Sequence, residues 1–458
     1  MTKRINFMKP VLMTATAMAA LMGSTFFANA EDMKTTLETA YLNNPNLEAA
    51  RASQRAIDET VNQEIGNWRP RIVGTGSWSR QNNERAGSFL EAGTTTPKSL
   101  GISVEQNVFR SFQTVNGTGE ARKNVEASRA QLHDTEQQIL IAAVEAYSNV
   151  IRDEAFLNFT STNVTSLQRQ LQASEDRFEV GEITRTDVAQ SRARLSRAQS
   201  EKIAAEATLT ASRASYQRIV GNEPGTLERD IVMPALPASE EAAYDIASRM
   251  HPAVIGANAS EAAANYAVKK QYGGLGPSVT VGASYTKSWD TFLPGDRTTA
   301  KAVQANLRVP FYQAGVQASI VRQAKQRRSQ FRMQAIAAER QVQELVRNSW
   351  ESYREASARI TSTLSQLEAN EIALEGVRQE ADVGSRTILD VLDAEQELLD
   401  ARVNNARAVR DRTVAGYNLL GATGQLTAQG LGLNVEYYDA EQKSKDAEHK
   451  IYGFGTEE

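Results

Sequence analysis

Four stretches of the chain alternate apolar and polar residues with a period of two, the pattern of β-strands with one apolar face. They cover residues 70–80, 99–110, 277–288 and 301–312. Each is about as long as a strand that crosses a bilayer, roughly 9–11 residues. The alternation is clear in the fourth stretch, where the apolar positions are Val303, Ala305, Leu307, Val309 and Phe311.

Long runs rich in Ala, Gln, Glu and Arg follow each pair of strands, at residues 112–221 and 314–424. Neither run contains a proline. Because proline inside a helix costs about 3 kcal/mol, this absence favours long helices. A helix over residues 112–179 would be roughly 100 Å long. Helices of this length bury their faces against one another, so the runs predict coiled-coil pairs.

The chain reads as a tandem duplication. Each half begins with a predicted helix of about 30 residues, at 34–66 and 240–271, and continues with two strands and a long helical run. The sequence Asn44-Pro45 near the start of the first half is echoed by His251-Pro252 in the second. The boundaries are therefore a first repeat at 31–232, a linker at 233–241 that carries Pro234 and Pro237, a second repeat at 242–428, and a tail at 429–458.

The first thirty residues have the form of a secretory signal peptide. Lys3 and Arg4 begin it, an apolar segment of suitable length follows, and Ala28-Asn29-Ala30 has the small-x-small pattern of a cleavage site. Its apolar segment is too short to cross a bilayer as a helix. We therefore expect an exported protein, with residues 1–30 removed as the signal peptide.

Composition excludes several kinds of site. The chain has no cysteine and a formal net charge of −4. Disulfides and thiolate metal sites are therefore impossible, and no block of Lys and Arg points to nucleic acid. The three histidines occur at separate places with no metal-ligand spacing, and no phosphate-binding loop or nucleophile elbow is present. We expect neither an enzyme nor a cofactor, and no metal site.

The strands leave two interpretations open. They could be half-buried strands of a soluble sandwich, or membrane strands with lipid on one side and water on the other. The rest of each repeat is helical, so no second apolar layer is available to cover a sheet. Four strands alone leave two open edges, and open edges do not occur in hydrocarbon. If the strands lie in a membrane, several chains must share one barrel.

The two repeated turns resemble those of a known family. The stretches "RFEVGEITRTDVAQSRARL" at 177–195 and "VGSRTILDVLDAEQELLDAR" at 383–402, together with the duplication, resemble the TolC family of outer-membrane efflux and type I secretion channels. The resemblance covers the chain after the signal peptide up to about residue 428. It implies an α+β membrane protein in which a homotrimer forms a 12-stranded β-barrel, four strands per chain, continued by an α-helical coiled-coil tunnel through the periplasm.

The same resemblance implies a function and partners. The protein would be a passive exit duct for drugs or secreted proteins, located in the outer membrane and extending into the periplasm. Its partners would be outer-membrane lipid, a periplasmic adaptor (membrane fusion) protein, and an inner-membrane pump or ABC transporter. The alternative considered is a structural periplasmic coiled-coil tether or adaptor subunit, and an exported hydrolase comes third. The tail at 429–458 is expected to be flexible or to lie along the outside of the tunnel.

Each repeated turn carries the residues of a helix cap. Gly181 and Gly384 suit the position just past a helix end, where φ is often positive. Thr184 and Thr387 suit the N-caps of the returning helices, with Asp187 and Asp390 three residues later as in a capping box. Capping leaves Asp393 unexplained. Asp393 shares a helix face with Asp390, and on a threefold axis the two would form a ring of carboxylates that favours cations.

The resemblance assigns further roles at this turn. Residues that match Asp390 and Asp393 line the narrowest point of the closed entrance in the family. The matching arginine, Arg386, bridges towards the positions of Asp187 and Thr186, and Gln170 matches another bridging position. The sequence departs from the family at Ala381, where a bridging tyrosine is expected, and at Arg378, where a bridging acid is expected. The closing contacts are therefore expected to be weaker or differently arranged.

Overall fold

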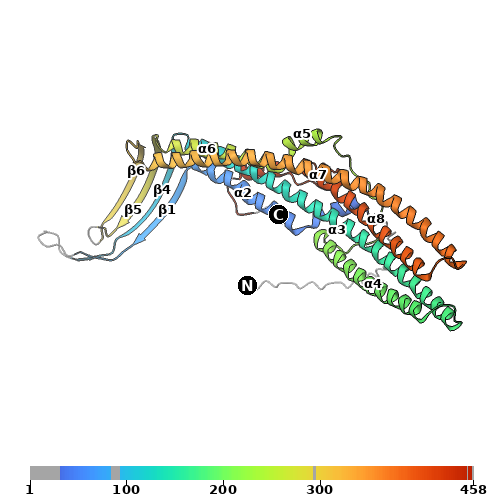
Figure 1. The fold of residues 1–458 in the computed structure, drawn as a ribbon. Helices are drawn as coiled ribbons and strands as arrows, with labels where there is room; N and C mark the ends of the chain where they lie inside the picture. Colours follow the sequence, from blue (N-terminus) through green and yellow to red (C-terminus); the bar gives the residue numbers. More distant parts are fainter. Residues whose placement is uncertain (1–30, 84–92, 292–294, 451, 456–458) are drawn as a thin grey trace, which may run out of the picture.

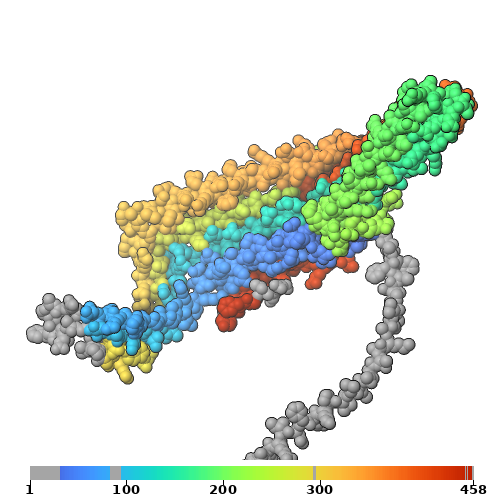
Figure 2. Space-filling model, turned by 90° about the horizontal axis from the view of Figure 1, so that it is seen from below, coloured from blue at the N-terminus to red at the C-terminus, as the bar shows by residue number. Residues whose placement is uncertain are grey.

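The structure is a computed structural model that describes residues 31–83, 93–291, 295–450 and 452–455. The predicted signal peptide lies outside the described residues. The chain is elongated, with a β-sheet at one end and two helical hairpins reaching the other end (Figure 1). The space-filling view shows the same extended body, which narrows towards the end that is far from the sheet (Figure 2).

One antiparallel sheet combines the strands of both repeats. Its order is β1 (Arg71–Trp78), β4 (Lys98–Phe109), β5 (Ser278–Trp289) and β6 (Arg297–Arg308). A separate two-stranded ribbon of β2 (Gln81–Asn83) and β3 (Gly93–Thr95) extends the first strand pair. Among the described residues β1 and β6 each pair with a single strand, so the sheet has two open edges.

The last strand differs in position from the predicted range of 301–312. It begins at Arg297 and ends at Arg308, two residues before Pro310. Proline has no N–H to donate to a strand partner, so the ladder does not continue through it. Val309 and Phe311, counted in the alternating pattern, therefore lie beyond the strand.

The register of the sheet separates the alternating residues onto two faces. One face is apolar over most of its length, and the other is lined by small and polar side chains. Both faces of the sheet are largely exposed in the single chain. One row of the apolar face consists of Ile72, Val104, Ala283 and Val303, and the neighbouring row of the polar face consists of Arg71, Glu105, Gly282 and Gln304.

Two long helices run the length of the helical part, as the proline-free runs predict. They are α3 (Gln113–Glu179) and α7 (Val316–Asp382), each of 67 residues. At 1.5 Å per residue each is roughly 100 Å long. The helices α4 (Arg185–Val220) and α8 (Ile388–Thr423) return along their far halves as antiparallel partners (Figure 1). We call the α3–α4 pair hairpin 1 and the α7–α8 pair hairpin 2.

The predicted helices at 34–66 and 240–271 are each broken in two, which corrects the expectation of single helices. The first becomes α1 (Met33–Asn43) and α2 (Pro45–Ile65), followed by the 3₁₀ turn η1 (Gly66–Trp68); the second becomes α5 (Glu240–Met250) and α6 (Pro252–Gly273). The reason is the proline that follows each break. A residue before proline is forced out of the helical conformation, and Asn44 and His251 are both extended, with ψ of 118° and 125°. Each instead caps the helix that the proline begins.

The main apolar core lies midway along the helices, where α1, α3, α4 and α8 meet the linkers of both repeats. Tyr147 and Tyr216 are fully buried in it. The Tyr147 hydroxyl lies 2.9 Å from the carbonyl oxygen of Glu31 and 2.8 Å from that of Glu228. These contacts hold the start and the end of the first repeat against α3. Burial raises the pKa of Tyr147, so this hydroxyl keeps its proton.

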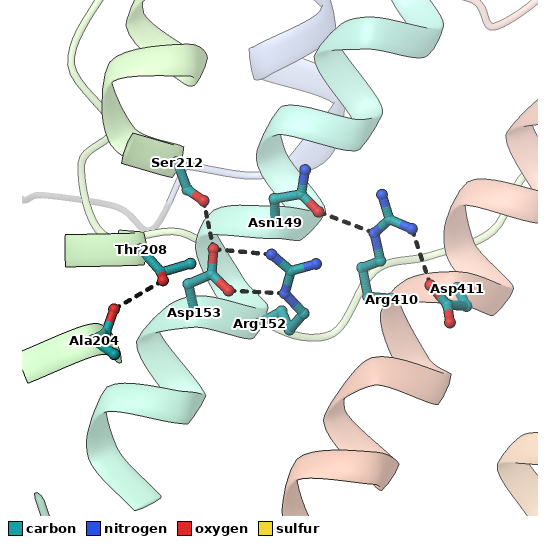
Figure 3. A network of polar contacts seen from close by, with 8 residues as sticks. All are labelled: Asn149, Arg152, Asp153, Ala204, Thr208, Ser212, Arg410 and Asp411. Atoms are coloured by element: carbon teal, nitrogen blue, oxygen red, sulfur yellow. Dashed lines mark hydrogen bonds and ion pairs between the residues drawn. The ribbon is translucent and has the colours of Figure 1, made fainter. Parts of the chain in front are cut away.

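A polar network next to this core joins the hairpins to each other. Figure 3 shows Arg410 of α8 directed at α3, where its Nε donates to Asn149 Oδ1 at 3.0 Å. One turn further along α3, Asp153 is 1% exposed, pairs with Arg152 at 2.8 Å and accepts a hydrogen bond from Ser212 of α4. A buried carboxylate is tolerated only with such partners, so the network fixes three helices together.

The C-terminal segment is not the flexible tail that its polar composition suggested. Residues 440–449 form α9 (Ala440–His449), which packs along α2. Asp439 caps this helix by accepting from the backbone of Glu441 and Gln442, both at 2.9 Å. Ahead of it Leu433 is buried in the main core. A few apolar anchors and one cap therefore order a segment whose overall composition is polar.

Candidate functional site

The ends of the two hairpins far from the sheet carry the predicted site. The turns are built alike: Gly181 and Gly384 both have φ of +81°, a conformation that glycine adopts without strain. The capping boxes predicted from the sequence are confirmed at both turns. Thr184 N–H donates to Asp187 Oδ2 and Thr387 N–H to Asp390 Oδ2, each at 2.9 Å, and both threonine hydroxyls lie 2.8 Å from the same oxygens.

These caps keep both aspartates ionised. Hydrogen bonds from the backbone and then the side chain of Thr184 lower the pKa of Asp187 below its ordinary value. The same two groups of Thr387 lower the pKa of Asp390, with a further contribution from the charge of Arg386. Each hairpin therefore presents a permanent negative charge at its tip, beside the positive end of a helix dipole.

Asp393, the acid that capping does not explain, pairs with the other hairpin. Its Oδ1 lies 2.6 Å from a guanidinium nitrogen of Arg194 on α4. The two side chains are 53% and 30% exposed, so solvent screens this pair only in part. An apolar cluster lies beside it and joins three helices of both hairpins; its buried members are Val164, Leu167, Ala198 and Leu392.

Arg386 lies at the turn of hairpin 2 but pairs within its own hairpin. Its Nε donates to Glu380 Oε2 at 2.8 Å, and this bond raises the pKa of the guanidinium further. In the described part of the chain no hydrogen bond joins Arg386 to Asp187, Thr186 or Gln170. Thr186 is exposed at the turn of hairpin 1. Gln170 lies about two turns before the end of α3 and is half-exposed.

The position that departs from the family, Arg378, has a partner that the sequence did not reveal. It pairs with Glu395 of α8 at 2.6 Å. At the equivalent place in hairpin 1, Arg192 of α4 pairs with Glu175 of α3 at 2.8 Å. Both pairs join residues 17 apart in the sequence, across the turn. A fixed separation of opposite charges across a predicted turn was therefore the signal that could have found them.

The hairpin tips provide charged side chains and contacts between the hairpins rather than groups for catalysis. In the ranges that the structure describes, no cluster of His, Asp and Glu side chains is suited to a metal ion. No helix in those ranges is long and apolar enough to span a bilayer. The hairpin tips instead gather carboxylates, arginines and an apolar contact between hairpins. These are groups that can form ion pairs and apolar contacts, within one chain or between chains.

A sheet with one apolar face, continued by long paired helices with charged tips, defines the class of tubular outer-membrane channel proteins. The chain belongs to the outer membrane efflux protein family, whose sequence profile matches residues 36–222 and 243–425. The two matched segments coincide with the two repeats. The protein is therefore an outer-membrane efflux channel protein and not an enzyme.

Named relatives and solved structures agree with this membership. The outer membrane efflux protein BepC of Brucella suis is 33% identical over 432 residues, 94% of this chain and 93% of BepC. The outer membrane protein TolC of Vibrio cholerae is 26% identical over 416 residues, 87% of this chain and 92% of that protein. The Campylobacter jejuni CmeC outer membrane channel has the same fold, with a TM-score of 0.79 at 14% identity over 91% of this chain and 89% of CmeC.

Proposed function

We propose that the chain is one of three subunits of a passive exit duct. The four-stranded sheets of three chains would close into one 12-stranded barrel in the outer membrane, and the hairpins would form a tunnel below it. One observation carries this proposal: the sheet has an apolar face, no protein layer covers that face in the described residues, and both of its edges are open. Open edges are not tolerated in hydrocarbon, so other chains must pair with them.

The entrance of the duct would lie at the hairpin tips. In the trimer Asp390 and Asp393 would approach the axis from each chain and form a cation-favouring constriction. Arg386 would bridge towards Asp187, Thr186 and Gln170 of another chain when the entrance is shut. The pairing of Asp393 with Arg194 within one chain adds a contact that holds the two hairpins together.

Energy and cargo selection would come from partners. Because the chain belongs to a family of channel proteins, we propose that a periplasmic adaptor docks on the hairpins and connects them to an inner-membrane pump or ABC transporter. Drugs or secreted polypeptides would then pass through the duct without entering the periplasm.

Cysteine cross-linking in lipid tests the shared barrel directly, because the native chain has no cysteine. One cysteine on β1 and one on β6 should form disulfides between chains and give a species of three subunits, provided that the pair matches the register. A panel of Val73→Cys and Thr75→Cys, each combined with Ala300→Cys or Ala302→Cys, samples that register. The same preparation should conduct ions across a planar bilayer.

A matched control places both cysteines on neighbouring strands of one chain. Ser103 and Ser284 are direct partners between β4 and β5, so Ser103→Cys with Ser284→Cys should close within the chain and give no larger species. If the β1–β6 panel also yields only single chains and the protein passes no current, the proposal is wrong.

A further inference from the structure

Basic side chains gather on the apolar face of the sheet, at the end far from the helices. In this part of the sheet the register places Lys98, Lys287 and Lys301 on the same face as Ile102 and the other apolar residues. Arg297 of β6 joins them, because it pairs with Trp289, the partner of Lys98. We call Lys98, Lys287, Arg297 and Lys301 the cationic band. All four are exposed.

The cationic band is compact. Lys98 and Arg297 share one row of the face, Lys287 lies in the next row, and Lys301 in the row after that. Successive rows on one face are about 6.6 Å apart and strands about 4.8 Å apart. The four charges therefore fall within roughly 13 Å along the strands and about 10 Å across them, which is the size of one or two lipid headgroups.

The carboxylates that lie near the cationic band belong to the turn beyond it and not to the strand rows that carry it. Its rows contain no acidic residue in the described part of the sheet. The nearest carboxylates belong to the turn between β5 and β6, where Asp290 accepts from the Gly295 N–H at 2.6 Å and Asp296 from the Thr291 N–H at 2.8 Å. A hollow of about 690 Å³ opens at this end of the sheet, lined by both aspartates and by Trp78, Lys98, Leu100, Trp289 and Arg297.

Aromatic residues surround the cationic band. Trp78 is 67% exposed and shares the row of Lys98, and Trp289 lies between Lys98 and Arg297. The Lys301 ammonium lies 6.0 Å from the centre of the Tyr285 ring. Tryptophan and tyrosine favour the level of lipid headgroups, where one end of the ring is apolar and the other is wet. Lysine and arginine at that level extend their charged ends to the same interface.

We propose that the cationic band binds the phosphate groups of an anionic lipid in the outer leaflet of the outer membrane. This inference rests on the proposed function, which turns the apolar face towards lipid. Towards the helices the same face holds only uncharged residues, such as Val104, Val281 and Val303, which suit the acyl chains. The charges therefore mark the level of the headgroups at one end of the strands, and they set the depth and orientation of the sheet in the bilayer.

The test measures lipid binding to the purified full-length protein with a matched pair of lipids. Bisphosphorylated lipid A should bind at least about tenfold more tightly than lipid A from which both phosphates have been removed, since each basic residue near a headgroup contributes appreciably. The variant with Lys98→Gln, Lys287→Gln, Arg297→Gln and Lys301→Gln should lose this preference.

The control removes charges from the opposite face of the same sheet. Arg71 and Arg308 lie on the polar face, so Arg71→Gln with Arg308→Gln should keep the wild-type preference. Inorganic phosphate at an equal phosphate concentration should not displace lipid A. Displacement would assign the cationic band to a free anion and would overturn the proposal, as would an equal preference in the wild type and the quadruple variant.

Cross-linking and conductance of the same preparations separate this inference from the proposed function. A quadruple variant that still forms the three-chain species and conducts ions is correctly folded, so its lost preference supports the lipid site. Wild-type protein that forms the conducting trimer but binds both lipids equally overturns the lipid site and leaves the proposed function standing. Protein that forms no trimer and no channel overturns the proposed function itself.

Discussion

Hairpin 1 and hairpin 2 have the same architecture but different chemistry at their tips. Both contain a helix of 67 residues and a helix of 36 residues, a glycine with positive φ, and a Thr–Asp capping box. The residues that form these features recur at equivalent positions. The residues that distinguish the tips do not: Arg386 of hairpin 2 stands where hairpin 1 has Ile183, and Asp393 where it has Gln190.

The comparison of the two tips distinguishes the residues that the turn needs for folding from those that the proposed entrance needs for its function. A turn between antiparallel helices needs a glycine and a cap, so both hairpins keep them. Arg386 and Asp393 are not part of these caps and have no counterpart at the equivalent positions of hairpin 1, whose own additional charges, Glu182 and Arg185, lie elsewhere in the turn. We infer that hairpin 2 carries the charged parts of the entrance, whereas hairpin 1 supplies partners such as Arg194 and Asp187.

Removal of both acids from hairpin 2 should have the largest effect. Asp390→Asn with Asp393→Asn would neutralise six carboxylates in the proposed trimer, so the preference for potassium over chloride in planar bilayers should fall several-fold. Glu182→Gln is the control, because it removes one exposed charge per chain from the tip of hairpin 1, outside both the cap and the proposed bridge. Unaltered selectivity in the double variant would remove the carboxylate ring from the mechanism.

Arg386→Ser should raise the conductance of the isolated channel. The substitution removes the bond to Glu380 and the proposed bridge to another chain, in three copies per channel. Ile183→Ser changes the equivalent position of hairpin 1, where no such bridge is proposed, and should leave conductance near the wild-type value. Equal conductance of the Arg386 variant and the wild type would contradict the closing role.

Arg194→Gln should also favour an open entrance, by a smaller amount. Partly exposed ion pairs contribute about 0.2–1 kcal/mol, so loss of the pair with Asp393 should shift the closed–open equilibrium by at most about fivefold per chain. Arg197→Gln, one turn along α4, is a close control because Arg197 pairs with Glu201 of its own helix. Single-channel recordings in which both variants behave alike would show that the contact between hairpins does not hold the entrance shut.

The sequence predicted the architecture because local rules determine it. The alternation of apolar and polar residues predicted the strands, and the absence of proline predicted the long helices. The breaks at Asn44 and His251 were equally local, since each precedes a proline. The contact between Arg194 and Asp393 was not accessible in this way. These residues are 199 positions apart in different repeats, and their contact depends on how two hairpins pack.

The prediction that the tail is flexible was wrong for a related reason, whereas the alternative, that it lies along the outside of the tunnel, is not contradicted by its packing on α2. Its average composition is polar, whereas its order depends on a few residues that reach distant parts of the fold. Leu433 enters the main core, and Tyr438 N–H donates to the hydroxyl of Tyr41 at 3.1 Å. Composition averaged over a segment does not reveal such anchors, because each depends on a pocket that another repeat supplies.

The two helix breaks differ in one titratable residue, and this gives a pH test. Burial lowers the pKa of His251, with a smaller opposing effect of Asp134 on α3; Arg410 and Asp411 of α8 line the same hollow. His251 Nδ1 accepts from the Ala253 N–H at 3.1 Å, which requires an unprotonated nitrogen. Because the folded pKa lies below the unfolded one, stability is complete above about pH 6.5 and falls as acid is added.

His251→Asn copies the first repeat and should abolish that part of the acid sensitivity. Each unit by which the pKa is lowered corresponds to about 1.4 kcal/mol. Thermal unfolding between pH 8 and pH 5 measures the change, with His133→Asn as control because that imidazole is 55% exposed on α3. An acid dependence that persists in the His251 variant would assign it to carboxylates elsewhere.

The ion pairs near the two turns test whether the hairpins also differ in stability, and here we expect the smallest effects. Hairpin 1 has Glu175 on the long helix and Arg192 on the short one, and hairpin 2 has the reverse, Arg378 and Glu395. If only the attraction matters, Glu175→Arg with Arg192→Glu should leave hairpin 1 within about 0.5 kcal/mol of the wild type, while Glu175→Arg alone should cost up to about 1 kcal/mol.

The single charge reversal in hairpin 2, Arg378→Glu, should lower stability more than Glu175→Arg does in hairpin 1, because the Arg378–Glu395 pair is less exposed. Glu395 is 11% exposed, against 38% for Glu175, so Arg378→Glu leaves a more deeply buried carboxylate facing a like charge. Hydrogen exchange of the amides near each turn measures the two hairpins separately within one molecule. Equal losses of protection at the two tips would mean that burial of Glu395 does not strengthen its pair, and that the two hairpins differ only in the residues that face the entrance.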